Sequence, residues 1–190
     1  MMTRVAVAVA ALGVVGAIAL ATGPTPLPQP VLDRLTTIDS VPTKKQLDFL
    51  FPMDPAQSLS TIARDTSGDY GIRLRAIHAL AKYCEQCSTT HIAHQTLTEL
   101  IDDTRTELAG ANLLLLRAAI ETIGTMQVAS DVNILVALLD HPSRDIRAAA
   151  ARALRDLCNT QASTPLRVRY TSESTEQVKL AISETLRILG

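Results

Sequence analysis

The side chains best suited to metal or redox chemistry lie in the segment CEQCSTTHIAH, residues 84–94. Two thiols, Cys84 and Cys87, are followed by two imidazoles, His91 and His94. Zinc could take these four ligands tetrahedrally, although their spacing is tighter than in the usual zinc modules. Cysteines three residues apart at a helix end also bring their Cα atoms to about 5 Å, a separation that a disulfide spans. We expect the disulfide in an exported protein, with a reduced pair and a metal site as the alternatives.

Outside this segment the sequence offers no catalytic constellation, and no cofactor is predicted. His78 and His141 are single histidines without a Ser, Cys or acid at catalytic spacing. No glycine loop of the phosphate-binding kind is present. The third cysteine, Cys158, is expected to be a buried core thiol.

The composition excludes two classes of binding. A formal net charge of −1 gives no bulk attraction to nucleic acid. With three tyrosines, two phenylalanines and no tryptophan, the chain has too few rings for base-stacking or sugar-binding platforms. We therefore expect no nucleic-acid partner.

The first residues predict export. Arg4 precedes an uncharged apolar run over residues 5–21, which ends in the small-x-small pattern that signal peptidases recognise. The run is close to the short limit for spanning a bilayer, so an uncleaved membrane tether through residues 5–21 is the alternative. Residues 22–42 follow as a Pro-rich linker, stiff and extended because four prolines fall within residues 24–30. The prediction is an exported protein, periplasmic or anchored facing the periplasm or exterior, with a folded domain over residues 43–190.

A helical pattern recurs four times in that domain, at spacings of 43, 31 and 32 residues. Its copies begin at Ile72, Leu115, Ile146 and Val178. Apolar or small residues recur at the first, fifth, ninth and twelfth positions, which share one face of an α-helix. The eighth position is small in every copy: Ala79, Thr122, Ala153 and Thr185. Because small side chains let helices approach closely, we predict that this side is a helix-stacking face.

Further helices are predicted around these copies. One precedes each of the first three, within residues 54–64, 91–104 and 131–140, whereas residues 160–174 before the fourth are predicted to be loop-like. Residues 43–51 are predicted to form an N-terminal capping helix. Helix pairs with such a period are typical of an α-solenoid. The predicted fold is therefore an all-α solenoid of about four helix pairs.

The segment LVALLDHPSRDIRAAAARALRDL, residues 135–157, resembles the HEAT repeat family, in particular its short form found in phycobilin-lyase-like and many bacterial proteins. The leucine pair, Asp140 and Pro142 in the turn, and Ile146 before Arg147 match that pattern. In the second copy Leu116 replaces the arginine, so a ladder of turn acids and helix arginines should be interrupted there. The resemblance implies a protein-binding scaffold. A lyase-type enzyme is the alternative by analogy, and export argues against it.

The resemblance also implies that the second helices line the concave side of the stack. We expect their polar side to bind a protein partner with acidic and apolar side chains, since cations outnumber acids there and Ile77 and Ile120 lie between them. The alternative is an ordinary solvated face, with both isoleucines in a neighbouring contact. The predicted partner-binding residues are Arg73, His78, Arg117, Arg147, Arg152, Arg155, Lys179 and Arg187.

The sequence stops within the fourth copy, at RILG. Solenoids normally carry a polar capping repeat, so we expect an uncapped apolar end and oligomerisation through it.

Overall fold

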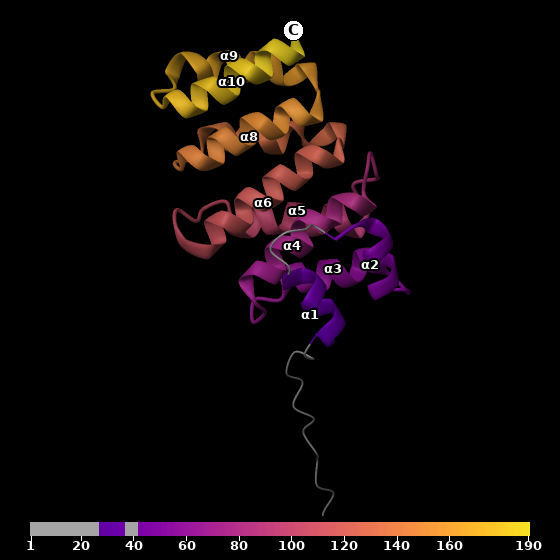
Figure 1. The fold of residues 1–190 in the computed structure, drawn as a ribbon. Helices are drawn as coiled ribbons and strands as arrows, with labels where there is room; N and C mark the ends of the chain where they lie inside the picture. The colour runs from indigo at the N-terminus through magenta and orange to yellow at the C-terminus, as the bar shows by residue number, and fades with distance from the viewer. Residues whose placement is uncertain (1–26, 37–41) are drawn as a thin grey trace, which may run out of the picture.

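The computed structural model describes residues 27–36 and 42–190, and within these ranges the chain is helical, without a strand. Four helix pairs stack in chain order, and Figure 1 shows the second helices of successive pairs side by side. The pairs are α3 (Pro55–Arg64) with α4 (Tyr70–Leu80), α5 (Ile92–Thr104) with α6 (Gly110–Met126), α7 (Val132–Ala137) with α8 (Arg144–Leu157), and α9 (Ser163–Ser172) with α10 (Glu176–Leu189). The 3₁₀ turns are η1 (Ala81–Tyr83), η2 (Ala129–Asp131), η3 (Leu138–Asp140) and η4 (Thr160–Ala162). The predicted all-α solenoid is confirmed.

Side-chain caps fix where the first pair begins. Asp54 accepts a hydrogen bond from the Gln57 N–H at 2.9 Å, and Pro55 fills the first position of α3, where no N–H is needed. Asp69 caps α4 in the same way, accepting from the Ile72 N–H at 3.0 Å. These N-cap side chains therefore determine where both helices begin, independently of tertiary packing.

Two helices cover the N-terminal end of the stack, α1 (Gln29–Thr36) and α2 (Lys44–Leu50). The predicted cap corresponds to α2, which begins at a capping box and packs against α3. Helix α1 packs against α4 and buries Val31 and Leu35 in the core. The extended linker predicted over residues 22–42 therefore does not hold for residues 29–36. Pro30 lies in the first turn of α1, where proline is tolerated, and the buried side chains hold the helix in place.

The predicted stacking face is buried along all four second helices. The first, fifth and eighth positions of every copy are buried. Helices α6 and α8 approach closely at Gly124, where an added Cβ would lie 2.7 Å from the Cα of Ala153. Helices α8 and α10 are joined by Thr185, whose hydroxyl lies 2.8 Å from the Ala151 carbonyl oxygen. Small residues therefore set the spacing between neighbouring second helices.

The loop predicted over residues 160–174 is wrong, because most of it forms the ten-residue helix α9. Its Ser, Thr and Arg residues give weak helix propensity and no clear apolar period. Leu166 and Ala162 are buried against the stack, and α9 packs on α10. Pro165 lies in the first turn, where its missing N–H removes no intrahelical hydrogen bond. Tertiary packing thus overrides local propensity here.

Among the helices of the described ranges, none is long and apolar enough to cross a membrane. The predicted signal or anchor, residues 1–21, lies outside the described residues, as do parts of the predicted linker. Export, membrane tethering and oligomerisation through the C-terminal end stay predictions.

Gly124→Ala should lower the free energy of unfolding by about 1–3 kcal/mol, although alanine is the better helix former. The added methyl group would overlap the backbone of Ala153 and force α6 and α8 apart. Urea unfolding followed by circular dichroism measures the loss. Thr125→Ala, at the adjacent exposed position, is the matched control and should change stability by less than about 0.5 kcal/mol. Equal stability of the two variants would contradict the close contact.

Candidate interaction surface

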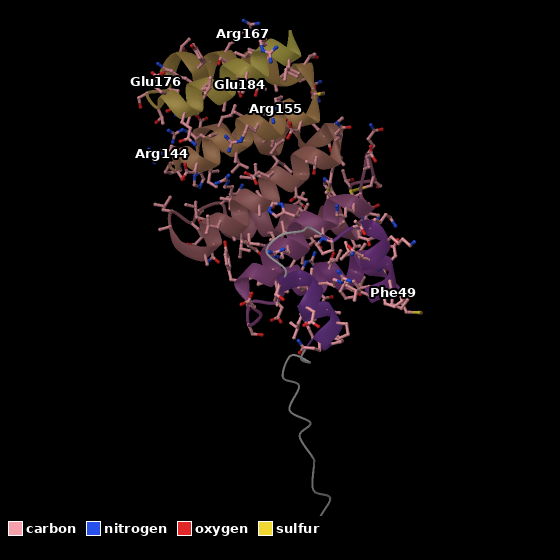
Figure 2. All side chains as sticks on the ribbon, in the orientation of Figure 1. Phe49, Arg144, Arg155, Arg167, Glu176 and Glu184 are labelled. Carbon is pink, nitrogen blue, oxygen red and sulfur yellow. A yellow bond between two sulfur atoms is a disulfide. The ribbon has the colours of Figure 1, made fainter. Side chains whose placement is uncertain are left out.

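The second helices turn a common side to solvent, which we call the second-helix face. The residues at the seventh repeat position, His78, Glu121, Arg152 and Glu184, are each exposed or half-buried. Figure 2 shows Arg144 and Arg155 projecting from α8 and Glu184 from α10 on the side turned to the viewer. The repeat therefore brings residues from four segments of the chain to one surface.

Several charges on this face are already paired within their own helix. The pairs are Arg117 with Glu121 at 2.8 Å, Arg155 with Asp156 at 2.9 Å, and Lys179 with Glu176 at 3.8 Å. Such solvent-accessible pairs contribute little to stability. They do reduce the charge that Arg117, Arg155 and Lys179 offer to a partner.

Three cations on the face, Lys82, Arg152 and Arg187, form no ion pair or hydrogen bond with another residue in the described ranges. Arg152 is half-buried near the middle of α8, and the other two are exposed. Glu184 is the acid that is likewise unpaired there. The sequence analysis missed Lys82 because the eleventh repeat position is threonine, aspartate and isoleucine in the other copies, so no pattern marks it.

Apolar side chains accompany these charges, but they are not the ones predicted. Leu114, Leu180 and Ile188 are 49%, 60% and 48% exposed. Ile77 and Ile120 are fully buried, so their assignment to the partner surface is wrong and they belong to the core. The exposed apolar residues are spread over α6 and α10.

Two further predicted residues contact the stack itself. Arg73 donates from Nε to the Ala63 carbonyl oxygen at 3.1 Å, which gives a hydrogen-bond partner to a carbonyl group in the last turn of α3. His78 lies in a shallow groove between α4 and α6, with its Nδ1 at 3.3 Å from the Thr122 hydroxyl. Partial desolvation in this groove lowers the pKa of His78, which favours the neutral imidazole at pH 7.

Arg147 is wrong as a partner-binding residue, because only 8% of it is exposed. Its Nε and Nη2 donate to the two carboxylate oxygens of Glu173 at 2.7 and 2.9 Å. Its Nη1 donates to the carbonyl oxygens of His141 and Pro142. The guanidinium beside Glu173 holds the pKa of that carboxyl well below its usual range, so the pair stays charged. This buried bidentate pair joins the third helix pair to the fourth.

His141 extends the network to the second pair. Its Nε2 donates to the Arg105 carbonyl oxygen at 2.9 Å, and its Nδ1 accepts from the Ser143 N–H at 3.0 Å. These two bonds require the neutral ring. Burial lowers the pKa of His141, which also favours the neutral form. Leu116 is buried and cannot join a charged ladder, as predicted. A histidine-to-backbone hydrogen bond bridges the second and third pairs instead.

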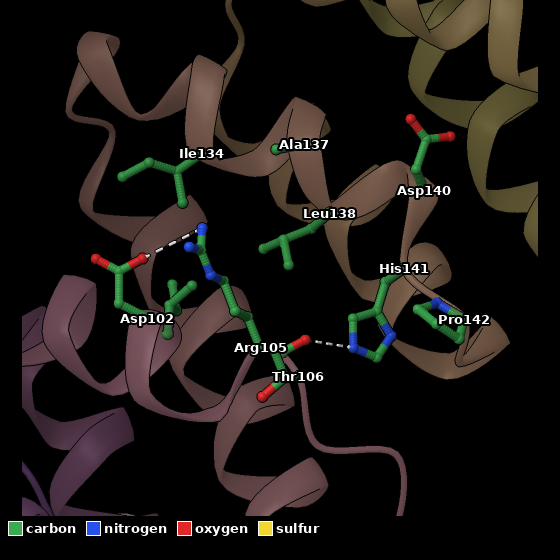
Figure 3. Close-up of a pocket in the computed structure, with 10 residues that line it drawn as sticks. Asp102, Arg105, Thr106, Ile134, Ala137, Leu138, Asp140, His141 and Pro142 are labelled. Carbon is green, nitrogen blue, oxygen red and sulfur yellow. Dashed lines mark hydrogen bonds and ion pairs between the residues drawn. The ribbon is translucent and has the colours of Figure 1, made fainter.

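A groove of about 310 Å³ lies between α5 and the segment α7–η3, on the first helices. Figure 3 shows Ile134 and Leu138 on one side of it and the Asp102–Arg105 contact on the other. His141 borders the groove but already uses both ring nitrogens in the hydrogen bonds above. The groove thus has one apolar side and one side where the charges are paired with each other, and we place the candidate site on the second-helix face.

The CEQC segment forms a tight turn closed by a disulfide between Cys84 and Cys87, whose Cα atoms are 5.0 Å apart. Between them, Gln86 adopts a positive φ of 50° and donates its N–H to the Met126 carbonyl oxygen at 2.7 Å. Ligand atoms of Cys84, Cys87 and His91 all lie within 4.8 Å of one another, so these three residues could hold a metal ion. The turn therefore places an imidazole beside the disulfide.

His94 does not belong to that cluster, which corrects the predicted four-ligand set. It is buried in α5, and its Nε2 donates to the carboxylate of Asp131 at 2.9 Å. The hydrogen bond with Asp131 raises the pKa of His94, against the opposing effect of burial. His94 therefore connects α5 to η2.

Cys158 is exposed, so the predicted core thiol is wrong. It is the C-cap of α8, with a φ of 54° in the left-handed region, and its Sγ donates to the Arg155 carbonyl oxygen at 3.1 Å.

Arg147→Met should lower the free energy of unfolding by about 1–3 kcal/mol, because buried Glu173 then keeps only Arg169 as a cationic partner and two carbonyl oxygens lose their donor. Chemical unfolding measures the loss. Arg152→Met makes the same chemical change on the same helix at a residue without an ion pair in the described ranges, and should cost less than about 0.5 kcal/mol. Similar losses for both variants would show that the Arg147 pair does not hold the stack.

Comparison with known proteins bears on the same part of the chain. No curated protein matches the sequence. HEAT repeats are commonly protein-interaction scaffolds. Residues 106–187, which include all of α6 to α9 and most of α10, match the family model of HEAT repeats.

Proposed function

We propose that this chain is a non-enzymatic protein-interaction module that acts outside the cytoplasm. Its second-helix face, expected to be the concave one, binds a partner segment that carries acidic and apolar side chains. The observation that carries the proposal is the set of unpaired cations on that face. The HEAT repeat match supports a protein partner in general terms.

The charges favour an acidic partner. Lys82, Arg152 and Arg187 have no counter-ion in the described ranges, whereas Glu184 is the corresponding free acid. A carboxylate-bearing segment would supply the missing partners, and Arg152 and Arg187 could each bind it through two parallel hydrogen bonds. Leu180 and Ile188 of α10 add exposed apolar surface beside Arg187. Charge and apolar contact together give the partner orientation as well as affinity.

The histidines support a role without catalysis. His141 uses both ring nitrogens in structural hydrogen bonds, and His94 is engaged with Asp131. His78 lies 3.3 Å from the Thr122 hydroxyl, but that hydroxyl donates its proton to the Ala118 carbonyl oxygen at 2.7 Å.

The location rests on the sequence of residues 1–21, which has the order of an export signal. A disulfide between Cys84 and Cys87 suits an oxidising compartment. In this setting the Pro-rich stretch before the domain would set the distance between the module and a membrane, if the apolar run is retained.

A peptide-display selection on the purified protein tests the partner chemistry. Bound peptides should be enriched in Asp or Glu together with Leu or Ile. The double charge reversal Arg152→Glu with Arg187→Glu should weaken a selected peptide about tenfold or more, measured by fluorescence anisotropy. The control is Lys45→Glu with Arg167→Glu, two exposed cations on α2 and α9. Equal affinity of both double variants, or selection of basic peptides, would overturn the proposal.

A further inference from the structure

The turn at Cys84–Cys87 is built independently of its sulfur–sulfur bond. The Gln86 N–H donates to the end of α6, and Ser88 and Thr90 bond to each other through their hydroxyl groups at 2.8 Å. His91 then caps α5, accepting a hydrogen bond from the Ala93 N–H at 3.3 Å. The backbone that carries all three candidate ligands is therefore held by contacts other than the disulfide, and of these only the His91 cap has to be given up when a metal binds.

We propose that the reduced form of this turn binds one thiophilic metal ion, Zn²⁺ or Cu⁺, through the sulfur atoms of Cys84 and Cys87 and a ring nitrogen of His91. Disulfide and metal are then alternative states of a single site. This inference is separate from partner binding on the second-helix face.

The distances suit such a site. A zinc ion with Zn–S bonds of about 2.3 Å in tetrahedral geometry separates its sulfur ligands by about 3.8 Å. The three ligand atoms lie within 4.8 Å of one another, and the two Cα atoms are 5.0 Å apart. Once the sulfur–sulfur bond opens, side-chain rotation is enough to bring both sulfurs around an ion.

The cluster lies beside the N-terminus of a helix. His91 is the N-cap of α5, a helix of 13 residues, so the positive end of the helix dipole lies beside the sulfur atoms. Cys84 is buried, and Cys87 and His91 are half-buried, which keeps the cluster accessible from one side. The cluster is thus open to an incoming ion while Cys84 anchors it to the core.

The chemistry balances in two steps. A dithiol reductant transfers two electrons and two protons to the disulfide, giving two thiols and the oxidised reductant. The metal ion then replaces the two thiol protons, which are released to solvent. An imidazole bound through one nitrogen carries a proton on the other, so His91 must give up its long bond to Ala93.

The ligand count limits which ion fits. His94 is not among the residues whose ligand atoms gather at this turn, so the protein supplies three ligands. Cu⁺, a soft ion, would be held by two thiolates and an imidazole alone, whereas Zn²⁺ would add a water molecule as its fourth ligand. Competition between the two ions distinguishes these outcomes.

The test uses the full chain in a Cys158→Ser background, which removes the free exposed thiol. The protein is reduced anaerobically and titrated with Co²⁺, as an optical stand-in for Zn²⁺, and with Cu⁺. We expect one ion per chain with a thiolate-to-metal charge-transfer band, and no binding by the oxidised protein. His91→Asn keeps a good N-cap residue while it removes the imidazole, and should weaken binding at least tenfold. His78→Asn, at a histidine outside the cluster, should leave the affinity unchanged.

Three results would overturn the proposal. The first is that reduced protein with a native circular dichroism spectrum takes up no metal. The second is that the His91→Asn and His78→Asn variants bind the metal with equal affinity. The third is a stoichiometry of one ion per two chains. A loss of helical signal on reduction would also count against it, since the turn is argued to stand without the disulfide. None of these results would affect the peptide selection that tests the second-helix face.

Discussion

The close approach of neighbouring second helices is the constraint on which the rest of this structure depends. Gly124 and Ala153 leave no room for a larger side chain between α6 and α8, and Thr185 bonds to the α8 backbone from α10. Each helix pair is too small to bury its own apolar side, so stability comes from the neighbouring pair. With small residues in the contact, the bulky and charged side chains of the same helices must face elsewhere. The second-helix face is a consequence of this division.

A buried polar network at the turns adds a second constraint, which fixes how successive pairs are oriented. Arg147 reaches Glu173 in the next pair, and His141 reaches the Arg105 backbone in the previous one. Buried charges are tolerated because every member has a partner with good geometry. Arg147 and Arg152 lie on one helix, yet the first is satisfied inside the protein and the second is not. This difference separates residues that hold the stack from residues that are free to meet a partner.

The sequence was sufficient for the parts of the fold that depend on periodicity. Apolar and small residues at fixed helical positions predicted the four second helices and the face on which they pack. Helices α1 and α9 were missed because proline and polar residues hide their few buried side chains, such as Leu35 and Leu166. Their stability comes from tertiary contacts, which no local pattern reports.

The candidate surface was predicted only in part, for a related reason. A helical pattern places an arginine on a side of the helix, but its counter-ion can come from far along the chain. Glu173 is 26 residues from Arg147, and Asp131 is 37 residues from His94. Glu173 makes Arg147 a structural residue, and Asp131 holds His94 in the interior, outside the cluster of Cys84, Cys87 and His91. Cys158 was misassigned because helices that end in the left-handed conformation usually carry Gly or Asn there, so nothing in the sequence indicated that α8 ends at this exposed cysteine.

Residue-resolved amide hydrogen exchange under native conditions tests most directly whether the small-residue contacts unite the stack. The account predicts that the slowest amides of α6, α8 and α10 exchange with one common opening free energy, because the contacts at Gly124 and Thr185 make them a single cooperative unit. If the amides of α8 instead open at a free energy clearly different from those of α6, the pairs unfold one at a time. In that case the close contacts do not make the stack a single cooperative unit.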